Sequence, residues 1–166
     1  IRGEHAANLG ALLAKEVADD AGVEAYIVDP VSCDEMNDLA RFTGLKDEER
    51  GSRAHYLNIK GVTRKSCREN GFDFYQDNFI VAHLGSGCSI GPLSKGRLID
   101  VNNANHGGPF SPERVGTLPN GVLLKYAFSG EYSLKSLSKL LQRNGGLLSH
   151  LGTNDARIVE KRIGEG

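Results

Sequence analysis

The segment best suited to chemistry surrounds two glycines, Gly85 and Gly87, which follow the short apolar run 79–84. That run is typical of a buried strand, and the residues after it predict two more strands, at 89–93 and 98–101. Glycine removes the Cβ penalty on positive φ, so the backbone N–H groups of such a turn can face one concavity that suits a phosphate. An ordinary hairpin, with glycine present for geometry alone, explains the same pattern.

A second candidate is Asp29, which follows the mostly apolar run 24–28 and precedes Pro30. The run predicts a strand, and ligand clefts in α/β sheets lie beyond the carboxyl ends of strands. Asp29 could therefore meet a metal or a reacting group. A turn-forming aspartate before proline is the competing interpretation.

A third candidate is Arg114, in a proline- and glycine-rich stretch at 105–119 that predicts a long loop. A guanidinium group offers a planar fork of donors that suits a phosphate or carboxylate. A local salt bridge to Glu113 or another acid is the alternative. His55 stands within a charged, helix-like stretch, where spacing alone favours a structural or solvent-facing histidine.

Composition sets the class of protein. The chain has 166 residues, of which 39% are hydrophobic and 25% charged, as in soluble globular proteins. A net charge of −1 gives no electrostatic reason to expect nucleic acid or an anionic membrane as partner. Three cysteines without a C-x-x-C pair predict reduced thiols and a cytoplasmic location. Because it begins at Ile1, we expect the chain to be a piece of a longer protein.

The elements that position these candidates follow from hydrophobic periodicity and capping residues. The stretch 47–70 is expected to bury Ala54, Leu57, Gly61 and Val62. The final helix is expected to be capped by Thr153 or Asn154. We expect helices at 5–20, 34–42, 47–70 and 119–128, one from Ser133 to Asn144 and one ending near 163, and strands at 24–28, 79–84, 89–93 and 98–101.

The segment 83–91, His-Leu-Gly-Ser-Gly-Cys-Ser-Ile-Gly, closely resembles the phosphate-binding motif of the acetate and butyrate kinase family, in the actin-like kinase superfamily. Further blocks resemble the butyrate kinase branch, at 4–10, 28–31, 101–104, 108–114 and 151–157. The resemblance implies an α/β fold of the actin-like (ribonuclease H-like) type. Residues 1–30 would end the first actin-like domain, and residues 31–166 would form the front of the second, nucleotide-binding domain.

The resemblance also implies an activity and roles for residues. Family members transfer the γ-phosphoryl group of ATP to a short-chain carboxylate such as butyrate, giving an acyl phosphate and ADP. The implied catalytic residues are Asp29, His55 and Arg114, with Asp29 also a candidate for ordering Mg²⁺. The implied nucleotide contacts are His83, Leu84, Gly85, Ser86 and Gly87, together with Asp155, Ala156 and Arg157.

These residue types suit that reaction. A carboxylate nucleophile, with a pKa of about 4–5, is already ionised at neutral pH and needs no strong base. The difficulty is that two anions must approach each other while charge spreads over the transferred group. Cationic and N–H donors placed around that group therefore supply most of the catalysis.

The family's further binding segments lie outside the blocks that match. We therefore expect the chain alone to be inactive and the full-length protein to be a homo-oligomer that binds a small carboxylate and ATP, without nucleic acid or membrane. One alternative is a non-catalytic actin-like nucleotide-binding module. Others are an acetate, propionate or isobutyrate kinase.

Overall fold

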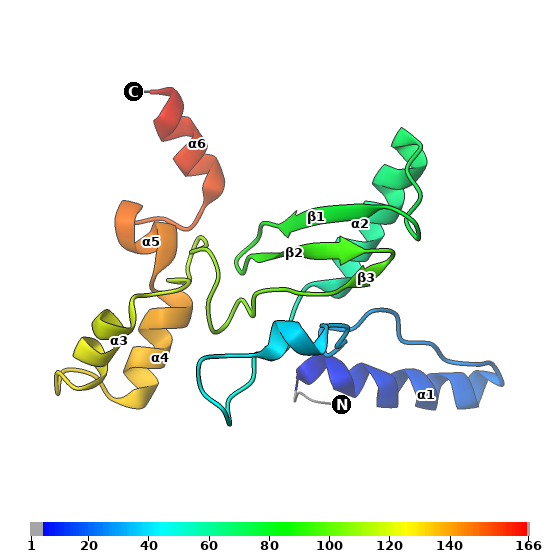
Figure 1. Cartoon of the computed structure of the whole chain (residues 1–166), viewed down its shortest axis with the longest axis horizontal. Helices are drawn as coiled ribbons and strands as arrows, with labels where there is room; N and C mark the ends of the chain where they lie inside the picture. Colours follow the sequence, from blue (N-terminus) through cyan, green and yellow to red (C-terminus); the bar gives the residue numbers. More distant parts are fainter. Residues whose placement is uncertain (1–4, 166) are drawn as a thin grey trace. The chain divides into compact units, whose positions relative to one another are not determined.

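The computed structural model describes residues 5–165, and the chain divides into two compact units (Figure 1). The first unit comprises residues 1–83 and 90–103, and the second comprises residues 84–89 and 104–166. The predicted domain boundary after residue 30 concerns the whole protein and stays a prediction.

The first unit is built on a three-stranded sheet in the order β1-β2-β3. Its strands are β1 (Asn78–His83), β2 (Ser89–Ser94) and β3 (Arg97–Leu98). Strands β2 and β3 are antiparallel, with Leu93 opposite Leu98, and the turn between them places Lys95 and Gly96 at positive φ. The predicted meander is confirmed, although β3 is shorter and begins one residue earlier than expected.

Helix α2 (Tyr56–Asn70) covers one face of this sheet (Figure 1). The side chains of Tyr56 and Ile59 are buried with those of Leu93 and Leu98. Removing such side chains from water contributes about 1.5–3 kcal/mol each. This packing fixes the helix against the strands that carry the glycine turn.

The predicted helix over 47–70 was wrong at its start and about its buried face. Residues 47–55 form a loop, held because Arg50 donates hydrogen bonds to the carbonyls of Ala40 and Val101 at 2.9 and 3.1 Å. The buried side of α2 comprises Tyr56, Ile59, Lys60, Thr63 and Cys67. Of the four residues expected to be buried, Ala54 is buried, in the loop before the helix, whereas Leu57, Gly61 and Val62 are exposed. The helix carries two apolar stripes, and the sheet covers only the one that begins at Tyr56.

The amino-terminal segment contains the short 3₁₀ turn η1 (Ala6–Asn8) and helix α1 (Leu9–Ala21), which ends at Gly22 with φ of 66° as predicted. The predicted strand at 24–28 was wrong, because no described segment pairs with it and a strand needs a neighbour for its ladder hydrogen bonds.

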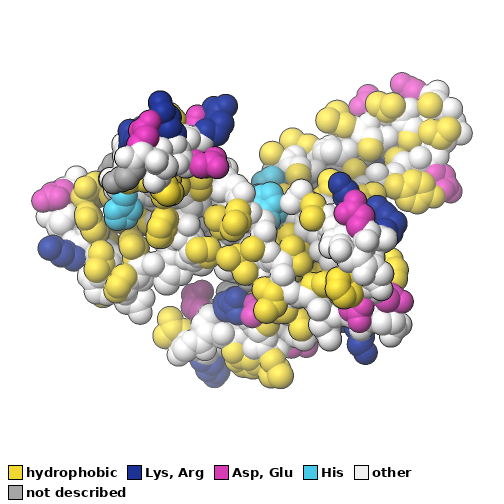
Figure 2. Space-filling view, turned by 90° about the horizontal axis from the view of Figure 1, so that it is seen from above, with side chains coloured by type: hydrophobic (Ala, Val, Ile, Leu, Met, Phe, Trp, Pro, Cys, Tyr) yellow, Lys and Arg dark blue, Asp and Glu magenta, His cyan; other side chains and the backbone are white. Residues whose placement is uncertain are grey.

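Hydrophobic side chains reach the surface over much of the face drawn in Figure 2.

The predicted helix at 34–42 reduces to the 3₁₀ turn η2 (Asp38–Arg41). Asp34 does not cap it, because the Asp34 carboxylate lies 2.5 Å from Arg41 Nη2. That ion pair joins the carboxylate to the side chain of the last residue of η2, and the residue at the N-cap position is Asn37.

The second unit contains four helices in its described part: α3 (Asn120–Ala127), α4 (Leu134–Arg143), α5 (Gly146–Leu151) and α6 (Ala156–Gly164). The Ser133 hydroxyl caps α4 by accepting a hydrogen bond from Ser136 N at 3.2 Å, as predicted. The cap of α6 is Asp155 rather than Thr153 or Asn154, and α5 was not predicted. No helix in the described chain is both long and apolar enough to cross a membrane.

Gly91 in β2 gives the first prediction, because a Cβ there would lie 2.2 Å from the backbone oxygen of Asp100. We expect Gly91→Ala to lower the free energy of unfolding by about 1–3 kcal/mol through overpacking. The control is Gly10→Ala, which has open space in α1 and should raise it by up to about 1 kcal/mol. Urea denaturation of the full-length gene product measures both; equal midpoints for the two variants would contradict the packing described.

Candidate functional site

A pocket of about 700 Å³ in the first unit is lined by two of the predicted catalytic residues, Asp29 and His55. The other walls are mostly apolar, with contributions from Val28, Val31, Leu57 and Val62, and with Asn58 and Lys65 as polar members. Asp29 follows the segment at 23–28, and His55 is the residue just before α2. The apolar stripe of α2 that faces away from the sheet thus forms part of this pocket.

His55 stacks on His83, the last residue of β1, with ring centroids 3.8 Å apart and an interplanar angle of 11°. His83 Nδ1 lies 2.8 Å from the side-chain oxygen of Asn58 in the first turn of α2. This contact joins the imidazole of His83 to the first turn of α2. The predicted nucleotide-contacting histidine and the predicted catalytic histidine therefore form one pair, which sequence spacing gave no means of finding.

Asp29 is held by two cations. Its side chain is 14% exposed, with Oδ1 at 3.2 Å from Lys60 Nζ and Oδ2 at 3.6 Å from Arg64 Nη1. The described residues include no group of three or more His, Cys, Asp or Glu side chains that could hold a metal ion. The role of Asp29 toward Mg²⁺ stays a prediction.

In the second unit, the glycine turn packs directly on Arg114. A Cβ at Gly87 would lie 2.5 Å from Arg114 Nη1, although Gly87 does not have positive φ. The Ser111 hydroxyl donates a hydrogen bond to Ser86 O at 2.6 Å and accepts one from Arg114 N at 3.1 Å. Glycine is therefore needed at 87 for close approach of the guanidinium, not for the backbone angle that the sequence interpretation invoked.

The guanidinium of Arg114 keeps donors that the described chain does not use. Nη1 donates to the Ala104 carbonyl at 3.2 Å, whereas the buried Nε has no hydrogen-bond partner among the described residues. No ion pair joins Arg114 to Glu113 in residues 5–165, so the salt-bridge alternative does not describe the structure.

Helix α5 fastens the loop that carries Arg114. The backbone N–H groups of Gly145, Leu147 and Leu148 donate to the carbonyls of Glu113, Ser111 and Pro112 at 2.9, 3.1 and 2.9 Å. The N–H groups at a helix start have no partner within the helix, so the loop satisfies them. A Cβ at Gly146, where φ is 60°, would lie 1.8 Å from Ser111 O, which accounts for glycine at this junction.

Asp155 and Arg157, the predicted further nucleotide contacts, bind each other at the start of α6, where Ala156 is the first helical residue. Asp155 Oδ1 accepts from Arg157 N and Nε at 3.0 and 2.9 Å, and Oδ2 accepts from Nη2 at 2.6 Å. These hydrogen bonds from Arg157, side-chain first, lower the pKa of Asp155 to about 2. The described contacts are those of a helix cap, and a nucleotide contact here stays a prediction.

The predicted site residues thus fall into two groups. Asp29, His55 and His83 belong to the first unit, and the structure brings them to one pocket and one histidine pair. The turn at 84–87 and Arg114 belong to the second unit and are joined through Ser111. Ser111, Asn58 and Lys60 were not predicted, because their contacts link positions far apart in the sequence.

The chain is similar to several curated proteins over its whole length. It is 47% identical over 166 residues to a "probable butyrate kinase 2" of Caldanaerobacter subterraneus subsp. tengcongensis, covering all of this chain and 47% of that protein. It is 49% identical to a "probable butyrate kinase" of Phocaeicola vulgatus and 46% identical to butyrate kinase 2 of Clostridium acetobutylicum, covering 47% of each. The chain therefore spans about half the length of the curated relatives it matches. No protein-family model matches it.

Solved structures share the fold. An acetate kinase of Porphyromonas gingivalis superposes with a TM-score of 0.69 at 24% identity, covering 79% of this chain and 35% of that protein. A propionate kinase of Francisella tularensis superposes with a TM-score of 0.68 at 24% identity, covering 79% of this chain and 36% of that protein. The predicted fold class, part of an α/β fold of the actin-like type, is confirmed.

Ser111 gives a prediction about the joint between the turn and the Arg114 loop. Ser111 is buried, so Ser111→Ala leaves Ser86 O and Arg114 N without their partner. We expect a loss of about 1–3 kcal/mol in the free energy of unfolding of the full-length gene product. Ser129→Ala, which removes an exposed turn hydroxyl, is the control and should cost less. Equal losses would refute the bridging role.

Asp155 gives a prediction about pH. The folded-state pKa of Asp155 is lowered, so its contribution to stability is present at neutral pH and is lost as pH falls from about 4 toward about 2. We expect the Asp155 carboxyl to titrate near pH 2 by NMR, and Arg157→Gln to raise that pKa toward the ordinary aspartate value. Arg162→Gln on the same helix is the control. An unchanged titration in Arg157→Gln would show that the pair does not form in solution.

Proposed function

We propose that the chain belongs to the acetate and butyrate kinase family and that its full-length protein transfers the γ-phosphoryl group of ATP to a short-chain carboxylate, giving an acyl phosphate and ADP. The observation that carries this proposal is the pocket that Asp29 and His55 line together. An acid and an imidazole beside mostly apolar walls suit a ligand with a short hydrocarbon part and a charged end.

The carboxylate acceptor is proposed to be butyrate. The relatives that match the chain at 46–49% identity are named butyrate kinases, and this similarity covers the chain from end to end. The acceptor is ionised at neutral pH, so its oxygen attacks phosphorus without a general base. The reaction forms one P–O bond to the carboxylate and breaks the P–O bond to ADP.

His55 and Arg114 are proposed to donate hydrogen bonds to the equatorial oxygens of the transferred phosphoryl group. Donors placed in advance stabilise the charge that spreads over these oxygens and need no reorganisation during transfer. The close packing of the Arg114 guanidinium on Gly87 of the glycine turn supports this role. Backbone N–H groups of residues 84–87 are proposed to contact the nucleotide phosphates, with further contacts from Asp155 to Arg157.

Magnesium is proposed to arrive with ATP as part of the substrate. Mg²⁺ commonly binds through one or two carboxylates together with phosphate oxygens and waters. Asp29 would supply one such carboxylate or orient a donor beside the ion. We also propose that the full-length protein works in the cytoplasm as a homo-oligomer, as the family resemblance implies.

Acyl-phosphate trapping with hydroxylamine tests the function. We expect the full-length gene product to form a hydroxamate from butyrate, ATP and Mg²⁺. His55→Gln should lower kcat by about 100- to 1,000-fold, because one donor to the developing charge is lost. The control is His150→Gln, an exposed histidine of α5.

The possible outcomes separate the alternatives. No hydroxamate from acetate, propionate, butyrate or valerate would refute the kinase and favour a non-catalytic nucleotide-binding module. A preference for acetate or propionate would refute butyrate as the acceptor. The 166-residue chain alone should give no product, and turnover by it would refute the need for the remaining family segments.

A further inference from the structure

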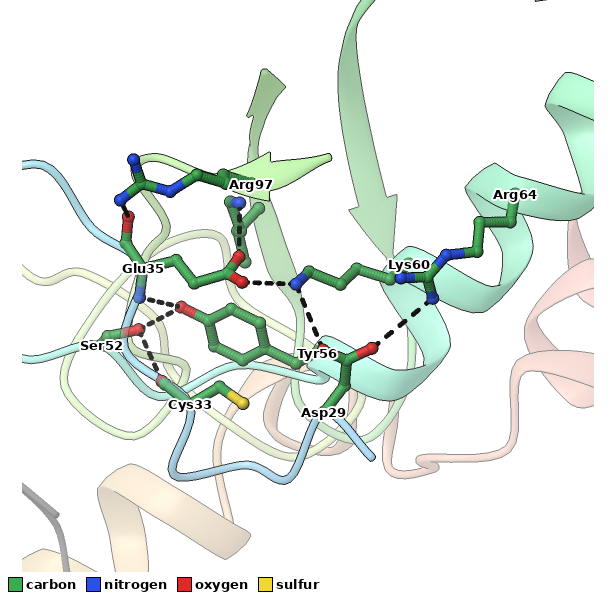
Figure 3. Close-up of polar contacts among 9 residues, drawn as sticks. Asp29, Cys33, Glu35, Ser52, Tyr56, Lys60, Arg64 and Arg97 are labelled. Carbon is green, nitrogen blue, oxygen red and sulfur yellow. Dashed lines mark hydrogen bonds and ion pairs between the residues drawn. The ribbon is translucent and has the colours of Figure 1, made fainter. Parts of the chain in front are cut away.

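Lys60 places a buried ammonium group between two carboxylates (Figure 3). The residue lies on the inner face of α2 and is only 5% exposed. Its Nζ is 3.2 Å from Asp29 Oδ1 and 2.5 Å from Glu35 Oε1. Breaking a buried ion pair by removing one partner is strongly unfavourable, so Lys60, Asp29 and Glu35 form one ionic cluster.

Glu35 connects this ionic cluster to the sheet. Its Oε2 accepts a hydrogen bond from Leu98 N in β3 at 2.9 Å, while its backbone oxygen accepts one from Arg97 Nη2 at 3.4 Å. The carboxylate is therefore fixed on one side by backbone of the core and on the other by the ammonium of Lys60. Because Lys60 binds both carboxylates, Asp29 is held at a fixed position relative to β3.

The Tyr56 hydroxyl binds the backbone of the segment that carries Glu35 (Figure 3). Its hydroxyl accepts from Glu35 N at 3.4 Å and lies 2.6 Å from Ser52 Oγ, which in turn donates to the Cys33 carbonyl at 3.2 Å. The Tyr56 ring is fully buried, and its centre is 5.9 Å from Lys60 Nζ. Residues 33–35 are thus fixed independently of Asp29.

The backbone at Asp29 is strained. Its φ of 43° lies in the left-handed region, which a non-glycine residue seldom adopts, and the following proline restricts it further. Such a conformation persists where the surroundings over-determine it, and it is concentrated at functional sites. Lys60 and Arg64, one turn apart on α2, each bind one carboxylate oxygen of Asp29.

From these contacts, and resting on the phosphoryl transfer proposed above, we infer that Lys60 is a positioning residue for the reaction. It fixes the Asp29 carboxylate at the pocket of His55 and is itself anchored to β3 by Glu35. Lys60 does not line the pocket. It acts on the reaction only through Asp29, and its ammonium transfers no proton.

The charge state fits this role. Burial alone would lower the pKa of the Lys60 ammonium, but hydrogen bonds to Glu35 and Asp29 outweigh burial and raise the pKa above the ordinary lysine value. The group therefore stays positively charged throughout the neutral range. A fixed charge holds the carboxylate without competing for protons in the reaction.

Steady-state kinetics of the full-length gene product test the inference with Lys60→Met, Asp29→Asn and the double variant. Because misplacement of a reacting or orienting group by about 1 Å can cost 100-fold, we expect Lys60→Met to lower kcat by about 10- to 100-fold. KM for ATP and butyrate should change less. In the Asp29→Asn background, Lys60→Met should have at most about a twofold further effect, since Lys60 acts through Asp29.

Two further variants keep the test decisive. Lys60→Arg keeps the charge and should recover part of the kcat lost in Lys60→Met. Glu35→Gln keeps the shape of the side chain that anchors Lys60 and should lower kcat, as Lys60→Met does. It replaces Lys60→Met in the test if that variant does not fold. The control is Lys15→Met, which breaks an exposed pair with Asp19 on α1 and should leave kcat unchanged.

Each outcome has one meaning. Independent, multiplicative losses for Lys60→Met and Asp29→Asn would overturn the positioning role and leave a purely structural ion pair. An active wild type with unchanged kcat in both Lys60→Met and Glu35→Gln would overturn this inference alone. A wild type that forms no acyl phosphate would overturn the proposed function, and this inference with it.

Discussion

The arrangement of the first unit depends on the two ion pairs that the buried ammonium group of Lys60 makes. This group joins helix α2 to Asp29 and Glu35, and Glu35 joins it to the backbone of β3. A charge at this depth is tolerable only with partners in good geometry, so the partners cannot shift independently. The strained backbone of Asp29 is held by Lys60 together with Arg64, while Tyr56 and Ser52 hold residues 33–35.

Each unit carries residues with proposed roles in the reaction. The first unit offers a carboxylate and a stacked histidine pair at a largely apolar pocket. The second offers the guanidinium of Arg114, packed on Gly87 and fastened by α5 through the loop at 111–113. In each unit the reactive side chain sits in a loop or at a helix end, and hydrogen bonds to regular elements hold that loop. Such preorganisation suits a reaction in which electrostatic stabilisation does most of the work.

The sequence predicted the parts of this fold that local signals determine. The meander, the capped helix α4 and the αL end of α1 follow from strand periodicity, Ser133 and Gly22. The buried face of α2 could not be predicted, because both of its stripes contain apolar residues and only packing on the sheet selects one. The strand at 24–28 was wrong for a similar reason, since its pairing depends on a neighbour that no local pattern reveals.

The site shows the same division. Asp29, His55 and Arg114 could be named from the resemblance to a family, whereas their spacing alone left each with an ordinary structural explanation. Lys60 and Ser111 gave no local signal, because Lys60 meets Asp29 31 positions away and Ser111 meets Ser86 25 positions away. Gly87 was identified for the wrong reason: its value lies in the space it leaves for Arg114.

The most direct test of the account is a crystal structure of the full-length gene product with MgADP, butyrate and a planar fluoroaluminate that mimics the transferred phosphoryl group. We expect His55 and Arg114 both to donate hydrogen bonds of about 3 Å to the fluorine ligands, with the Asp29 carboxylate still bound to Lys60. A structure in which either side chain points away from the mimic, or in which Lys60 has released Asp29, would contradict it.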